Sequence, residues 1–269
     1  MNGELRGRLE AKSEQLDIPL IGIAPAERWG EEPMHPWVPE QFRPLSIWPE
    51  VRSVVVIGLP VDLPVVETAP SIYYHEMYKT VNALLDQSAY RLARFLDRSG
   101  HPSIYIPRDG YGSLTVLKKD PFAFFSHRHA AYLAGLGSFG VNNMLLTPAY
   151  GPRVRFTSIF TTAELPADSI MEEDLCTRCM RCSRLCPAEA LDRKGYPEGI
   201  TRKDACIAYN EKLSGRHVSP CGWCIRVCPV GEDRERFERT SPQMYEREDV
   251  RPELHRAWKH VRSHGSEQD

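Results

Sequence analysis

The sequence predicts a mixed helix-and-strand protein in which a larger α/β domain carries a compact cysteine module near its C-terminal end. All eight cysteines lie between Cys176 and Cys228, and the first 175 residues contain none. Upstream of the module, apolar runs of strand length alternate with segments of helical periodicity. A chain of 269 residues is long enough for one large domain with a small module. We place the boundaries at residues 1–170 for the α/β domain, 171–232 for the cysteine module and 233–269 for a charged tail.

Composition limits the class of protein. Apolar residues make up 42% of the chain, which supports a sizeable core, and a formal net charge of -2 gives no case for wholesale phosphate binding. The longest apolar run, residues 53–61, has the length of a strand, and the charged N-terminus lacks the apolar stretch of an export signal. We therefore expect a cytoplasmic protein without membrane contact. Disulfides are rare in that compartment, so clustered cysteines indicate metal or redox chemistry.

Periodicity and turn residues predict the individual elements. Helices are expected over residues 3–16, 72–100 and 126–137, and one more helix docks the tail through Leu254, Trp258 and Val261. Strands are expected over residues 18–26, 53–61, 102–107 and 153–165, and the Pro- and Trp-rich segment 27–44 is typical of an ordered loop. The apolar face of the long helix is expected to include Met77, Val81, Leu84, Leu85, Tyr90, Leu92 and Leu96.

The cysteines form two motifs with the spacing of a ferredoxin that binds two [4Fe–4S] clusters. The first is CxxCxxCxxxCP, from Cys176 to Pro187, and the second is Cys206 followed by CxxCxxxCP, from Cys221 to Pro229. In such modules three close cysteines hold one cluster, and the cysteine before the proline ligates the other. We assign one cluster to Cys176, Cys179, Cys182 and Cys228. We assign the second cluster to Cys186, Cys206, Cys221 and Cys224.

Structural zinc is the alternative occupant, because it also takes four cysteines. Zinc sites favour separate CxxC pairs rather than a continuous CxxCxxCxxxCP run, so the spacing favours iron–sulfur clusters. A CxxCxxC turn can point its sulfurs and several backbone N–H groups at one compact anion, whose negative charge those groups stabilise. Proline after the fourth cysteine has no N–H and ends that turn.

Closely spaced glycines precede the cysteines, at Gly135, Gly137 and Gly140. They would allow a flat cofactor to approach the backbone, or they would serve as turns in the chain. The string follows a predicted helix rather than a strand, which disfavours a Rossmann nucleotide site.

Taken with the cysteines, this stretch resembles the cobalamin-dependent iron–sulfur reductases, which comprise the epoxyqueuosine reductases and the reductive dehalogenases. Their pattern is AGLG-x-x-G, LL-x-x-x-x-G and a strand ending in T-x-x-x-L, ahead of both cysteine motifs. The matching residues here are Ala134, Gly135, Leu136, Gly137, Gly140, Leu145, Leu146, Gly151, either Thr161 or Thr162, and Leu165. The resemblance covers about residues 18–230.

The resemblance implies a nitroreductase-like α+β domain that binds cobalamin, joined to a two-[4Fe–4S] ferredoxin module. Electrons would pass through the clusters to cobalt, and a nearby acid would donate a proton to a small-molecule substrate. The chain ends about forty residues after Cys228, without the helical-repeat domain that helps epoxyqueuosine reductases hold tRNA, so tRNA is not expected as a partner. Two further departures are Val141, where the family often has Lys or Arg, and the context of Asp109 and Asp120, which lack the family's V-D-x-x-P motif.

Several polar and aromatic residues are candidates for the cofactor site, each with a structural alternative. Tyr73 and Tyr74 begin the long helix and either line the cofactor site or pack as ordinary aromatics; Tyr74 is also a candidate proton donor. His127 either faces the pocket or is a cap or core histidine. Candidates for hydrogen bonds to corrin amides are Asn142 and Asn143, which would equally tolerate a left-handed turn.

Among the acidic residues, Asp109 is the best catalytic candidate, with solvated surface as its alternative. The leading hypothesis is thus a corrinoid-dependent iron–sulfur oxidoreductase that acts on a small molecule and takes electrons from a ferredoxin- or flavodoxin-type donor. One alternative is a non-catalytic electron-transfer protein that reduces a partner such as a corrinoid protein. A second alternative is a flavin-binding reductase, because nitroreductase-like domains also bind flavin.

Overall fold

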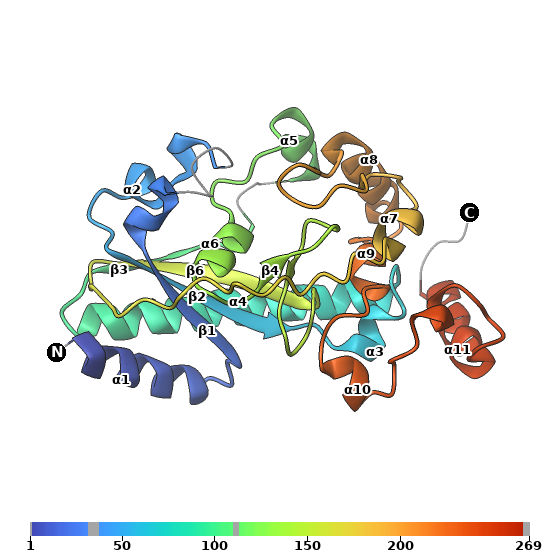
Figure 1. Ribbon diagram of the computed structural model, residues 1–269, viewed down its shortest axis with the longest axis horizontal. Helices are drawn as coiled ribbons and strands as arrows, with labels where there is room; N and C mark the ends of the chain where they lie inside the picture. Colours follow the sequence, from blue (N-terminus) through green and yellow to red (C-terminus); the bar gives the residue numbers. More distant parts are fainter. Residues whose placement is uncertain (1, 32–37, 110–112, 266–269) are drawn as a thin grey trace.

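A four-stranded antiparallel sheet forms the centre of the larger domain (Figure 1). The computed structural model describes residues 2–31, 38–109 and 113–265. The strands are β1 (Leu20–Pro25), β2 (Ser53–Pro60), β3 (Ser103–Ile106) and β6 (Val154–Thr161), in the order β1-β2-β6-β3. Each neighbouring pair is antiparallel, and Val56 of β2 lies opposite Ser158 of β6.

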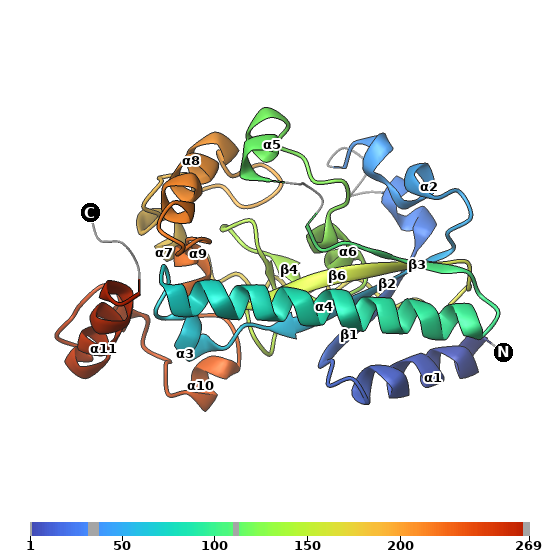
Figure 2. The ribbon, with the colours of Figure 1, turned by 180° about the vertical axis from the view of Figure 1, so that it is seen from behind.

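Helices cover both faces of this sheet. The long helix α4 (Ile72–Arg98) lies along one face with α1 (Asn2–Glu14) beside it, and α6 (His127–Leu133) lies on the other face (Figures 1 and 2). Alternate residues of β2 therefore enter two cores: Val55 packs in the core that includes α4, and Val54 packs in the core that includes α6. Burial on both faces explains why the sequence of β2 is apolar without interruption.

Most elements predicted for the larger domain are present, with shifted ends. The exception is the apolar face of α4, where the prediction was wrong for two residues: Leu84 is 48% exposed and Tyr90 is 54% exposed. Only one stripe of the helix, including Val81, Leu85 and Leu92, contacts the sheet, and both exposed side chains lie outside it.

Short elements complete the larger domain. The segment predicted as an ordered loop contains η1 (Ala26–Gly30), η2 (Glu40–Phe42) and the start of α2 (Pro44–Ile47), while residues 32–37 lie outside the described part. The remaining short elements are α3 (Leu63–Val66), α5 (Leu114–Lys119), β4 (Ser138–Phe139) and β5 (Leu145–Leu146). β4 and β5 form a separate two-stranded sheet.

The cysteine module contains three helices, α7 (Arg181–Arg184), α8 (Lys203–Ser214) and α9 (Trp223–Arg226). The segment after it contains α10 (Asp233–Arg236), η3 (Pro242–Tyr245) and α11 (Pro252–Ser263). A third core joins the two parts and consists of Val227, Met244, Tyr245 and Trp258. Across the described ranges, no helix has the length and apolar character needed to span a membrane.

His127 fixes the start of α6 to the sheet. Its Nε2 lies 3.0 Å from the carbonyl oxygen of Pro107, which can only accept, so Nε2 carries the proton and donates. Its Nδ1 therefore accepts the hydroxyl of Ser158 on β6, at 2.9 Å. Burial is the main cause that lowers the pKa of His127 to about 4, and the nearby Arg155 acts in the same direction.

We expect this histidine to make the protein less stable in mild acid. The unfolded histidine has a pKa near 6.5, so below that pH the unfolded state binds a proton that the folded state excludes until about pH 4. His127→Gln keeps one donor and one acceptor but cannot titrate. The stability lost by the wild type between pH 7.5 and 5.5 should be smaller in this variant by about 1 kcal/mol, measured by anaerobic urea unfolding. An equal loss in both proteins would contradict the assignment.

Candidate functional site

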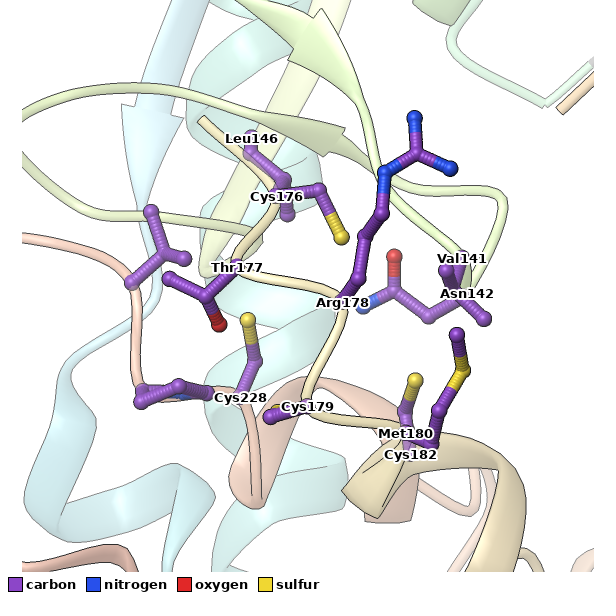
Figure 3. A pocket seen from close by; sticks show the side chains of 12 residues that line it. Val141, Asn142, Leu146, Cys176, Thr177, Arg178, Cys179, Met180, Cys182 and Cys228 are labelled. Carbon is purple, nitrogen blue, oxygen red and sulfur yellow. The ribbon is translucent and has the colours of Figure 1, made fainter. Parts of the chain in front are cut away.

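Four of the predicted cluster cysteines surround one pocket. Its lining includes all four cysteines of the first group (Figure 3). The members of that group are Cys176, Cys179, Cys182 and Cys228. The last of these comes from the loop after α9, whereas the other three come from the segment that leads into α7 and from α7 itself (Figure 3). The structure thus brings together the thiols that the crossover spacing assigned to one cluster.

The backbone around both cysteine loops adopts left-handed conformations. Arg178 and Met180 have positive φ angles of 51° and 58°, and Met180 precedes α7. Gly222, with a φ of 72°, precedes α9 in the same way. Turns that alternate left- and right-handed residues direct successive N–H groups at one point, which makes them suitable for an anion such as an iron–sulfur cluster.

The second group of cysteines lies beside the first. Burial is the main cause that raises the pKa of the Cys221 thiol to about 12, and the neighbouring Cys206 and Cys186 act in the same direction. Burial and the other thiols of its group also raise the pKa of Cys224, and Cys182 of the first group raises it as well. Within each group the thiols are close enough to repel one another as anions, and a bound cationic metal would remove that repulsion.

A residue that the sequence analysis missed, Asn210, ties the second group together. Its Oδ1 accepts the backbone N–H of Cys221 at 2.9 Å, and its Nδ2 lies 3.7 Å from the sulfur of Cys206.

Over the described part of the chain, no three His, Cys, Asp or Glu side chains converge where one metal ion could bind.

A polar cluster lies next to the second group of cysteines, and we call it the Arg155 cluster: Tyr74, Tyr78, Asn82, Asp109 and Arg155. Arg155 of β6 donates to Asn82 Oδ1 at 3.0 Å and to Asp109 Oδ1 at 3.3 Å, and its guanidinium lies 4.5 Å from the ring centre of Tyr78. Tyr74 packs edge-on to Tyr78, with ring centres 6.2 Å apart.

Tyr74 connects this cluster to the second cysteine loop. A Cβ at Gly222, between Cys221 and Cys224, would lie 2.8 Å from the Tyr74 ring, so only glycine allows this close approach. Burial raises the pKa of Tyr74, and its phenol therefore keeps its proton at neutral pH. The structure brings the candidates Tyr74 and Asp109 to one place. Arg155, which bonds Asp109 and stacks on the Tyr78 ring beside Tyr74, was missed, although a charged residue inside an apolar strand was a visible signal.

The two asparagines have different partners. Asn142 lines the first pocket, and its Nδ2 donates to the carbonyl of Cys224 at 3.3 Å, so it bridges the two cysteine loops. Asn143 has a left-handed φ of 56° and donates to Thr201 at 3.0 Å. Its Oδ1 is buried and has no partner among the described residues. Water or a bound group can supply the donor that such a buried acceptor needs.

The remaining candidates have structural explanations. A Cβ at Gly135 would meet the carbonyl oxygen of Ser169 at 2.2 Å, and one at Gly137 would meet that of Leu146 at 1.8 Å, so backbone occupies the space beside both. At Gly140 the nearest atom is Oδ1 of Asn142, at 2.7 Å.

For Tyr73, His127 and Asp109, a role at the cofactor or catalytic site stays a prediction. Tyr73 is 54% exposed, whereas Tyr74 is 2% exposed. Both ring nitrogens of His127 have protein partners, which supports its reading as a core histidine. Asp109 lies between Arg155 and Arg108, and these ion pairs use its carboxylate as an anion.

Known proteins with similar sequences include reductive dehalogenases and epoxyqueuosine reductases. A family described as 4Fe-4S binding domain matches residues 170–192. Tetrachloroethene reductive dehalogenase of Dehalobacter restrictus is 26% identical over 193 residues, which cover 66% of this chain and 32% of that protein. Epoxyqueuosine reductase of a Synechococcus species is 27% identical over 223 residues, which cover 77% of this chain and 65% of that protein. The chain thus spans about a third of the dehalogenases that it matches.

Solved structures show the same fold. The catabolic reductive dehalogenase NpRdhA aligns with 93% of this chain and 36% of its own, with a TM-score of 0.65 and 19% identity. An epoxyqueuosine reductase bound to an epoxyqueuosine-modified tRNA-Tyr stem loop aligns with 90% of this chain and 70% of its own, with a TM-score of 0.58 and 19% identity. The chain carries a 4Fe–4S binding domain and is a homologue of the tetrachloroethene reductive dehalogenases and epoxyqueuosine reductases, as the sequence motifs predicted.

Proposed function

We propose that this protein is a corrinoid-dependent iron–sulfur oxidoreductase that passes electrons through two [4Fe–4S] clusters to cobalamin and reduces a small-molecule substrate. The observation that carries the proposal is the contact between Tyr74 and Gly222, because it joins the Arg155 cluster to the second cysteine loop. Redox centres and a proton-bearing side chain are thereby adjacent.

The donor sets fit two clusters. Each group supplies four cysteine sulfurs, which is the ligand set of a [4Fe–4S] cluster. The left-handed residues before α7 and α9 form turns of the kind that direct backbone N–H groups at an anion. The electrostatic contact of Cys182 with Cys224 supports placing the clusters side by side, which favours electron transfer between them.

Support for cobalamin comes from a related fold and from one unsatisfied atom. A solved dehalogenase with a TM-score of 0.64 and 18% identity is described as suggesting a mechanism for B12-dependent dehalogenation. The buried Oδ1 of Asn143 would accept a hydrogen bond from a corrin amide. Cobalamin, when bound, would supply a redox-active cobalt that reduces the substrate. The nitroreductase-like architecture of the larger domain is part of this proposal.

The residues of the Arg155 cluster have separate tasks in this proposal. Tyr74 holds a proton at neutral pH and would donate it to the reduced substrate. Arg155 positions the Asp109 carboxylate by a hydrogen bond and the Tyr78 ring by a cation–π contact. Burial excludes water from Tyr74, which restricts proton exchange to groups bound beside it.

Electrons would enter at the first cysteine loop. Thr177 and Arg178 of this loop are exposed, whereas the second loop packs against Tyr74. A ferredoxin- or flavodoxin-type donor would therefore dock near the first cluster. The same exposed loop also supports a second candidate function, an electron-transfer protein that reduces a partner such as a corrinoid protein.

The metal content of the purified protein tests the proposal. Anaerobically reconstituted protein incubated with cobalamin should contain about eight irons and about one cobalt per chain, with a corrinoid absorption spectrum. The matched control is the same protein reconstituted without cobalamin. Eight irons without cobalt would favour the electron-transfer protein, and a flavin spectrum would favour a flavin reductase. Absence of iron would contradict all three functions.

Paired cysteine variants test the assignment of ligands. The Cys179→Ser/Cys228→Ser double variant should keep about four irons, because both residues belong to the first group. The Cys179→Ser/Cys221→Ser double variant should lose iron from both clusters. Iron content is measured after anaerobic reconstitution, with Thr177→Ala as the control in the same loop. If the first double variant also lost both clusters, the crossover of Cys228 would be wrong.

A further inference from the structure

We propose that the buried Arg234 raises the reduction potential of the iron–sulfur cluster that Cys228 ligates. The inference rests on the proposed function, because it requires a cluster in the first cysteine pocket. Arg234 would act through charge rather than by contact with iron, and is therefore a tuning residue rather than a ligand.

The guanidinium of Arg234 points at the ligand loop. The residue belongs to α10 and is 2% exposed. Its Nε and Nη2 donate to the carbonyl oxygen of Cys228 at 3.0 and 2.6 Å, and Nη2 also donates to the carbonyl oxygen of Arg226 at 2.6 Å. Its Nη1 donates to the hydroxyl of Tyr245. All of these acceptors are neutral groups.

A second buried arginine reaches the same carbonyl but carries its own counter-ion. Arg153 is 0% exposed and donates to the Cys228 carbonyl oxygen at 3.3 Å. It also forms a double hydrogen bond with Asp233, at 2.6 and 2.5 Å, so the carboxylate compensates its charge. Among the described residues, no carboxylate forms an ion pair with Arg234. Glu67 is one step removed, because it accepts the Tyr245 hydroxyl and pairs with Arg239.

The excess positive charge acts on the redox equilibrium of the cluster. When an external donor gives the cluster one electron, the cluster gains one negative charge and Arg234 stays protonated. A buried positive charge stabilises the more negative state strongly, because the protein interior screens it less than water does. Reduction of the first cluster therefore becomes easier. Asp233, directly beside Arg234 in the sequence, has the opposite effect.

Variants that change the charge in opposite directions at the adjacent buried residues Arg234 and Asp233 distinguish an electrostatic role from a structural one. Arg234→Gln removes the positive charge, Arg234→Lys retains it, and Asp233→Asn removes the negative charge while keeping an acceptor for Arg153. The exposed Arg247, which pairs with Asp249, provides the control variant Arg247→Gln.

The experiment is an anaerobic potentiometric titration of reconstituted protein followed by electron paramagnetic resonance, with iron content measured first. We expect Arg234→Gln to lower the potential of one of the two clusters and Asp233→Asn to raise the potential of that same cluster. Arg234→Lys should stay near the wild-type potential, and Arg247→Gln should shift neither cluster.

The outcomes distinguish failure of this inference from failure of the proposed function. Wild-type protein without iron would overturn both. Wild-type protein with two clusters, but unchanged potentials in iron-replete Arg234→Gln, would overturn the tuning role alone. Shifts in the same direction for Arg234→Gln and Asp233→Asn would show a structural effect and also overturn it. If Arg234→Gln fails to retain iron, the cluster potential of Asp233→Asn decides. An upward shift of that potential supports the electrostatic role, and an unchanged potential overturns it.

Discussion

The buried side chain of Arg153 holds the cysteine module against the sheet. It immediately precedes β6, is fully buried, and bonds Asp233 together with the carbonyl oxygens of Ile225, Cys228 and Val230. Removing one partner of a buried ion pair of this kind costs about 3–5 kcal/mol, because it leaves the other charge uncompensated. Arg153 thus sets the position of the cluster ligands relative to the sheet, together with the contacts of Asn142 with Cys224 and of Tyr74 with Gly222.

The same part of the chain also organises the cofactor side of the molecule. Arg155, two positions after Arg153, reaches α4 through Asn82 and Tyr78. One short segment therefore supplies a cation to each side: the buried Arg153 at the ligand loop of Cys228, and the partly buried Arg155 at the polar cluster beside Tyr74. Gly222 closes the connection by letting the Tyr74 ring contact the second cysteine loop. Electron transfer and proton donation would both depend on this packing.

The relatives show how this arrangement fits into larger proteins. The fold extends over 93% of this chain but only 36% of the aligned dehalogenase, so the sheet and the cysteine module together form the part that the two proteins share. Within that part, both donor sets and the Arg155 cluster are present in one chain. A shared fold does not by itself set the substrate, which depends on the particular residues of the site.

The sequence by itself determined the chemistry of the cysteines and most of the elements. Cysteine spacing is a local property, and so are the continuous apolar run of β2 and the glycine that follows α4. Tertiary structure decided which polar groups meet. Arg153 and Asp233 are 80 residues apart, and Arg155 and Asn82 are 73 apart, so no local pattern could pair them. The same holds for the glycines: the sequence left Gly137 open between a cofactor contact and a turn, and only the structure shows the carbonyl of Leu146 beside it. Close packing between distant segments sets these contacts, and it leaves no periodic signal in the sequence.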